Sequence, residues 1–148
     1  MRKRAMQHLL LIVALFLFAS PALADDFLYV VCRIKGSNTS TNLISRDVLN
    51  NDYVDFLMFK VDLSKSLFRN HRAPEWIRIS VVGNTIVQDT KINGEGFSAH
   101  VKGVLPLNPP GSISIDNWFR NTTEYRVIKG KGDCRKTDSS TWEKLAVD

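Results

Sequence analysis

The sequence has few of the residues that build metal or redox sites. Its 148 residues include two cysteines, Cys32 and Cys134, and no C-x-x-C motif. Of the three histidines, only His71 and His100 lie beyond the N-terminal segment, and no third ligand is evident beside them. Because a zinc site needs at least three protein ligands, we expect no metal and no cofactor.

Catalytic motifs are also missing. The chain has no G-x-S-x-G, no H-E-x-x-H, no G-x-x-x-x-G-K-[ST] and no dinucleotide fingerprint. Ser98 and His100 share one face of an expected strand, but residues two apart stand roughly 7 Å apart, beyond hydrogen-bond reach. We therefore predict no catalytic residue. The alternative is a small hydrolase whose acids or histidines converge only in the folded chain.

A concentrated charge of one sign is absent. The chain has 20 Lys and Arg against 15 Asp and Glu, and three of the cations are Arg2, Lys3 and Arg4. Without these three the balance is only +2, and the remaining cations are scattered among acids. Because nucleic-acid binding needs a concentrated basic face, we expect no nucleic-acid partner.

The N-terminal segment has the three parts of a secretion signal. The cations at 2–4 precede an apolar run at 9–19, and Pro21, Ala22 and Ala24 supply a helix breaker and small residues at the cleavage positions. The apolar run has 11 residues, too few for the roughly 20 that span a bilayer. The pattern predicts cleavage after Ala24, a mature chain that begins at Asp25, no membrane span after signal removal, and a periplasmic or secreted location.

The two cysteines are expected to form a disulfide. An even number of cysteines in an exported chain usually means a bridge, because oxidising compartments favour it. A Cys32–Cys134 bridge would close almost the whole mature chain, and its two Cα atoms should lie within about 7 Å.

Short β-like runs dominate the chain after residue 24, and turn residues separate them. We expect strands at 27–34, 53–61, 76–82, 85–88, 95–101, 112–116 and 124–128. The first should end at Gly36, and the second should be covered on both faces because it is apolar on both. Gly83–Asn84 and Asn93–Gly94 predict two tight hairpins, and the prolines in 105–111 should interrupt the ladder.

Helix should be scarce. We expect at most two turns in each of the segments 41–50 and 62–70. Ser140 to Glu143 has the form of a capping box, but the residues after it are too few for a stable isolated helix. The pattern predicts one domain at 25–148: an antiparallel β-sandwich or small β-barrel with one disulfide between its first and last strand regions.

The stretch most suggestive of binding is Trp118-Phe119-Arg120, followed by Tyr125. Aromatic rings beside a guanidinium are suited to stack on and hydrogen-bond a small ligand. The alternative is ordinary core, because large aromatic side chains are mostly buried.

These observations favour a non-enzymatic exported β-domain that binds a small molecule or another surface. The sequence identifies no ligand, and a structural or envelope-interaction role is a third interpretation.

Overall fold

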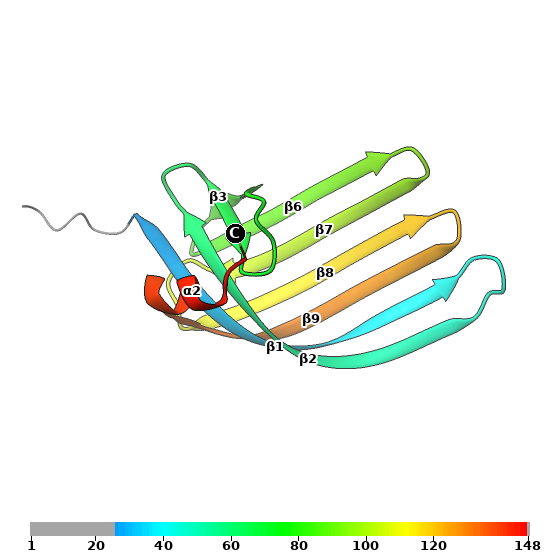
Figure 1. Cartoon of the computed structure of the whole chain (residues 1–148), viewed down its shortest axis with the longest axis horizontal. Coiled ribbons are helices and arrows are strands. Elements are labelled where there is room, and N and C mark those ends of the chain that lie inside the picture. Colours follow the sequence, from blue (N-terminus) through cyan, green and yellow to red (C-terminus); the bar gives the residue numbers. More distant parts are fainter. Residues whose placement is uncertain (1–25, 148) are drawn as a thin grey trace, which may run out of the picture.

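The fold is one antiparallel sheet with a short C-terminal helix (Figure 1). The structure is a computed structural model and describes residues 26–147. The strands and the helix are β1 (Phe27–Asn42), β2 (Val48–Asp62), β3 (Leu67–Asn70), β4 (Ile77–Arg78), β5 (Ser80–Val82), β6 (Thr85–Gly94), β7 (Phe97–Pro106), β8 (Gly111–Asn121), β9 (Glu124–Lys136) and α2 (Ser139–Leu145). The expected signal, with Ala22, Ala24 and the cleavage before Asp25, lies outside the described residues.

The sheet is so strongly curved that its two edge strands are consecutive in the sequence. The strand order is β4-β3-β2-β1-β9-β8-β7-β6-β5, so the edge strands β4 and β5 are consecutive and only Ile79 separates them. The Ile79 amide donates to the Ser66 carbonyl at 3.0 Å, which holds this junction against the β2–β3 turn. The predicted fold class is confirmed as a nearly closed, barrel-like antiparallel sheet.

Closure is confined to one end of the sheet. The β3 strand pairs only with Phe59 to Asp62 of β2, and β5 pairs only with Thr85 to Val87 of β6. Beyond these short strands, the β1–β2, β8–β9 and β6–β7 hairpins project as long arms (Figure 1). The sheet is therefore nearly closed at one end and an open trough at the other.

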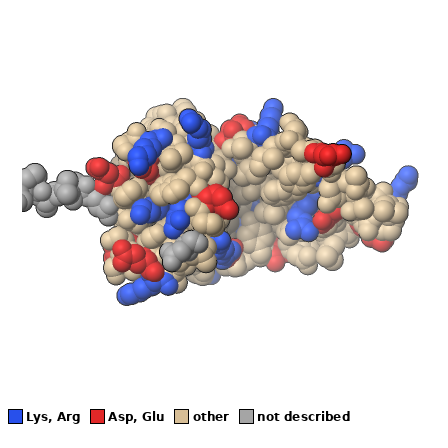
Figure 2. Space-filling model, turned by 45° about the horizontal axis from the view of Figure 1, so that its top comes forward, with Lys and Arg blue, Asp and Glu red and all other residues tan. Residues whose placement is uncertain are grey.

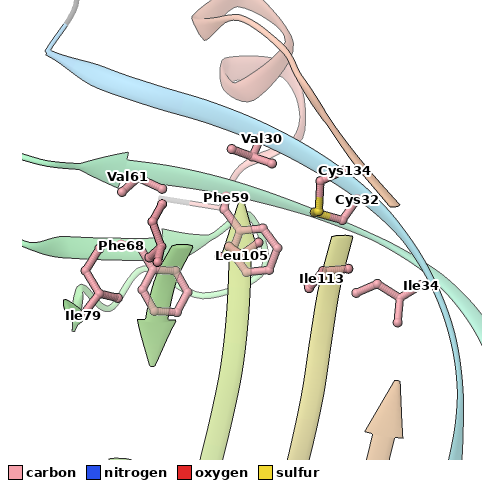
Figure 3. Packing of buried hydrophobic residues seen from close by; sticks show 11 residues of the cluster. Val30, Cys32, Ile34, Phe59, Val61, Phe68, Ile79, Leu105, Ile113 and Cys134 are labelled. Atoms are coloured by element: carbon pink, nitrogen blue, oxygen red, sulfur yellow. A yellow bond between two sulfur atoms is a disulfide. The ribbon is translucent and has the colours of Figure 1, made fainter. Parts of the chain in front are cut away.

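The closed end holds the main core and the disulfide. Cys32 and Cys134 are directly opposite one another on β1 and β9, with their Cα atoms 4.0 Å apart, so the predicted bridge is confirmed. The bridge packs among inward-facing side chains of six strands (Figure 3). These include Val30, Ile34, Phe59, Val61, Phe68, Leu105 and Ile113.

A second cluster, on the outer face of β1 and β2, explains the helix. Trp142 of α2 is 4% exposed and packs on Tyr29 and Met58. The side chain of Asp138 caps the helix by accepting from the Thr141 amide at 2.8 Å. A helix of seven residues is unstable alone, so the burial of Trp142 stabilises it here.

Several sequence predictions about local structure are wrong. Gly36 does not end β1, which continues to Asn42. The segments 41–50 and 62–70 contain tight turns and strand rather than helical turns, with Arg46 and Ser66 at positive φ. The second hairpin turn lies at Glu95–Gly96, where Gly96 has a φ of 71°, and Asn93–Gly94 is the end of β6.

The described residues contain no helix long and apolar enough to cross a membrane. On the face seen in Figure 2, cations and acids are interspersed, without a broad patch of one sign.

Candidate functional site

The residues predicted to bind a ligand are divided between the two faces of the sheet. Side chains alternate along a strand, and Ile113 and Ile115 of β8 face inward. Phe119 therefore also faces inward, whereas Trp118 and Arg120 face outward. Tyr125 lies opposite Arg120 on β9, with its ring 6.4 Å from that of Trp118. The structure brings Trp118, Arg120 and Tyr125 together and separates Phe119 from Trp118 and Tyr125, although Phe119 and Arg120 both line a hollow at the ends of β8 and β9; their role in binding stays a prediction.

Beside this outer aromatic patch, His100 binds Asp89 rather than Ser98. The His100 Nε2 lies 2.5 Å from Asp89 Oδ1, and the hydrogen bond from His100 lowers the pKa of the Asp89 carboxyl. Within residues 26–147, no hydrogen bond joins Ser98 to His100. The arrangement is an acid–imidazole pair on the outer face of β6 and β7.

The inner face offers a deeper site. A small cavity of about 170 Å³ at the closed end adjoins a groove of about 490 Å³ in the trough, and the two share Leu57, Asn70, Ile115 and Asn117. We call the larger hollow the inner groove. Its apolar lining comes from four strands: Ile34, Leu57, Ile115 and Ile128. Ligand sites usually combine such an apolar surface with a few placed polar groups.

Tyr53 lies across one side of the inner groove, over two glycines. A methyl group at Gly130 would lie 2.6 Å from the Tyr53 hydroxyl, and one at Gly36 would lie 2.8 Å from its ring. The hydroxyl donates to the Lys129 carbonyl at 3.4 Å. Burial, and then the Asp55 charge, raise the pKa of the Tyr53 phenol, which is therefore neutral.

An ion pair between Arg72 and Asp55 lies at the rim of the inner groove. Arg72, in the β3–β4 loop, makes two hydrogen bonds to Asp55 of β2, at 2.6 and 2.7 Å. The bond from Arg72 lowers the pKa of Asp55, and the same bond raises the pKa of Arg72. Since the two charges cancel, the rim favours neither an anionic nor a cationic ligand.

Four asparagines give the groove its polar groups: Asn38, Asn51, Asn70 and Asn117. The Oδ1 of Asn117 accepts from the Lys102 amide, and the Oδ1 of Asn70 accepts from the Arg72 amide, both at 2.9 Å. These bonds fix the two amide planes and leave their NH₂ groups to donate. The Oδ1 of Asn38 is buried and has no partner in the protein. Unsatisfied buried polar atoms are rare in native proteins, so Asn38 suggests a ligand group that donates to it.

His71 fastens the loop that carries Arg72. The Met58 amide donates to His71 Nδ1 at 3.1 Å, and the His71 amide donates to the Met58 carbonyl at 2.9 Å. The first bond requires an unprotonated Nδ1. Burial, and then the Arg72 charge, lower the pKa of His71 below its ordinary 6.5.

We expect His71 to make the stability of the protein depend on pH. Because its pKa is lower in the folded chain, its contribution is complete above pH 6.5 and is lost as the pH falls through the lowered pKa. His71→Gln keeps an acceptor for Met58 that does not titrate, so the loss of stability below about pH 6.5 should be smaller in this variant. Urea unfolding at a series of pH values measures the difference. Equal slopes in wild type and His71→Gln would contradict the assignment.

Sequence reasoning missed the inner groove. Asn38 lies four residues after Ile34, so the two share a face of any strand that includes both, but Gly36 was interpreted as the end of that strand. Among residues 26–147 no group of three or more His, Cys, Asp or Glu side chains is placed to hold a metal ion. Comparison with known proteins gives no match: no family model, no curated protein and no solved structure matches this chain.

Proposed function

We propose that the chain is an exported, non-catalytic binding module whose inner groove takes an uncharged polar ligand with an apolar face. Oligosaccharides have this chemistry, because a sugar ring presents C–H groups on its faces and hydroxyls around its edge. The observation that carries the proposal is the buried Oδ1 of Asn38, which has no protein partner in a groove that combines apolar walls with three further amides.

The electrostatics of the groove support an uncharged ligand. Its one acid and one guanidinium, Asp55 and Arg72, are bound to each other at both oxygens. A charged ligand would have to compete with this two-bond pair, whereas a hydroxyl or amide could bond to the asparagines directly. The disulfide is compatible with an oxidising compartment and so supports the exported location.

The direct test follows the asparagine side chains by NMR. Neutral tetrasaccharides of glucose and of N-acetylglucosamine are titrated separately into isotope-labelled protein. We expect the NH₂ resonances of Asn38, Asn70 and Asn117 to shift, while the indole N–H of Trp118 on the outer face stays unchanged. A shift confined to Trp118 would move the site to the outer aromatic patch. No shift with any of these sugars at about 10 mM would contradict an oligosaccharide ligand, because the dissociation constant would then lie well above about 10 mM, too weak for a specific site.

Asn38→Leu should separate binding from stability. Removing a buried acceptor that has no partner should leave the free energy of unfolding unchanged or raise it by about 1 kcal/mol. Binding of a sugar that shifts the groove resonances should weaken at least tenfold, about 1.4 kcal/mol. Urea unfolding and the same NMR titration measure the two effects.

The matched control is Asn108→Leu, an exposed asparagine at the other end of the sheet. It should leave sugar binding as in wild type. A clear loss of stability in Asn38→Leu would show that Asn38 is a structural residue and would remove the main support for the proposal.

A further inference from the structure

The outer edge of β2 is uncovered over half its length. Along one side β1 pairs with β2 throughout, but on the other side β3 reaches only Phe59 to Asp62. Next along this edge, His71 bonds to both backbone groups of Met58, and Arg72 donates to the Phe56 carbonyl at 3.3 Å. Along an antiparallel strand, every second residue directs its backbone N–H and C=O groups to the same side. The same side as for Met58 and Phe56 is therefore reached by the backbone groups of Val54, Asp52, Asn50 and Val48. On this side, no other described segment forms hydrogen bonds to these four residues. We call residues 48–54 the free edge of β2; it lies along the outside of the β1–β2 hairpin in Figure 1.

The free edge of β2 exposes three aliphatic side chains and carries one charged residue, Asp52. Val48, Leu49 and Val54 are 59%, 61% and 56% exposed. Proteins usually protect such edges with lysine, proline or a bulge, and residues 48–54 contain neither lysine nor proline. The opposite unpaired edge, residues 88–94 of β6, carries the charged pair Asp89 and Lys91. The β2 edge carries one charge and no lysine, so it is the less protected of the two edges.

The sequence of this edge is complementary to itself. In Val-Leu-Asn-Asn-Asp-Tyr-Val, an antiparallel copy centred on Asn51 places Val48 opposite Val54, Leu49 opposite Tyr53 and Asn50 opposite Asp52. Valine is then opposite valine, an aliphatic residue is opposite an aromatic one, and an amide is opposite a carboxylate to which it can donate. Such cross-strand pairs stabilise a sheet, and no like charges oppose each other.

We propose that two copies of this chain associate through the free edge of β2, pairing antiparallel about a two-fold axis at Asn51. Each pair except Asn51–Asn51, which lies on the axis, then occurs twice, as a closed two-fold interface requires. The pairing joins two open sheets into one, and it places Leu49 of each copy opposite Tyr53 of the other. It does not depend on what the inner groove binds.

The first test changes the Asn50–Asp52 pair, which occurs twice in the dimer. Asn50→Lys places a cation opposite Asp52 of the other copy and should lower the dimer dissociation constant about tenfold, whereas Asn50→Asp places an acid there and should raise it about tenfold. Sedimentation equilibrium of the disulfide-bonded protein measures the constants. The matched control is Lys91→Asp on the β6 edge, which should leave the dimer unchanged. A protein that is monomeric at about 1 mM, or a dimer unaffected by either Asn50 substitution, would overturn the proposal.

The second test is a disulfide cross-link at Asn51, the residue on the proposed two-fold axis. Asn51 would face its own copy in a pair without direct backbone hydrogen bonds, where the Cα atoms are about 4.5 Å apart, close enough for a disulfide. Asn51→Cys should therefore give a covalent dimer on mild oxidation, whereas Asn93→Cys, at the end of β6, should not. The Asn50 and Asn51 side chains are exposed and make no hydrogen bond, so both variants should fold, which circular dichroism checks. Cross-linking at Asn93 but not at Asn51 would assign the contact to β6 and overturn the proposal.

Discussion

Replacing both Cys32 and Cys134 by alanine should lower the free energy of unfolding by about 2–5 kcal/mol. The bridge closes a loop of 102 residues, so it restricts the unfolded chain more than a bridge between near neighbours would. Both residues are almost fully buried, at 0% and 3% exposure, and alanine adds no polar atom to the core. Part of the loss comes from the vacated sulfur volume and part from the freer unfolded chain.

Urea unfolding of wild type and the double variant measures this change. The slope of the unfolding free energy against urea should also increase, because a chain without the cross-link exposes more surface when it unfolds. Reduction of the wild type with a phosphine should reproduce both effects. A loss below about 1 kcal/mol would show that the β1–β9 pairing alone holds this region.

Gly36→Ala should destabilise the protein by about 3 kcal/mol or more, at the upper end of what overpacking usually costs. A methyl group at this position would lie 2.0 Å from the Lys129 carbonyl oxygen and 2.8 Å from the Tyr53 ring. The carbonyl belongs to the backbone of β9, which pairs on both sides, so it cannot move aside without disturbing two ladders.

Gly94→Ala is the matched control for this effect. Gly94 is also a strand glycine, but nothing lies within 4 Å of the position its methyl group would take. Its stability should change by about 0.5 kcal/mol or less. Thermal or urea unfolding compares the two variants. Equal effects would mean that the loss reflects the intrinsic behaviour of glycine in strands and not the close contact under Tyr53.

The parts of the fold that local patterns determine could be predicted from the sequence. The turn at Gly83–Asn84 and the interruption by the prolines between β7 and β8 are both observed. The disulfide was also predictable, because two cysteines allow only one pairing. These features depend on a few adjacent residues or on simple counting.

The remaining features depend on contacts between distant segments. Gly36 was expected to end a strand, because glycine is unfavourable within one; the reason for its presence is the Tyr53 ring from the neighbouring strand. The expectation that residues 53–61 are covered on both faces is wrong for Val54 and Phe56, which are 56% and 58% exposed. Their apolar pattern resembles that of a buried strand, but on this outer face α2 packs only over the region of Tyr29 and Met58.

The candidate binding residues also could not be predicted from neighbouring residues alone. Trp118 and Phe119 were grouped because they are adjacent, yet strand alternation places them on opposite faces. The asparagines of the inner groove come from β1, β2, β3 and β8. These asparagines line one groove only because of the order of the strands in the sheet, and no short segment of the sequence specifies that order.

The pairing of β1 with β9 has a consequence for the kinetics of folding. The first strand of the sheet hydrogen-bonds to the last, so the centre of the sheet is incomplete until residues 124–136 are available. Before then, β1 has only its hairpin with β2, and an isolated hairpin is marginally stable in water. Sheets dominated by such distant contacts fold in milliseconds to seconds, more slowly than helical proteins of similar size. An N-terminal fragment of this chain should therefore remain open to proteases and chaperones until its last strand arrives.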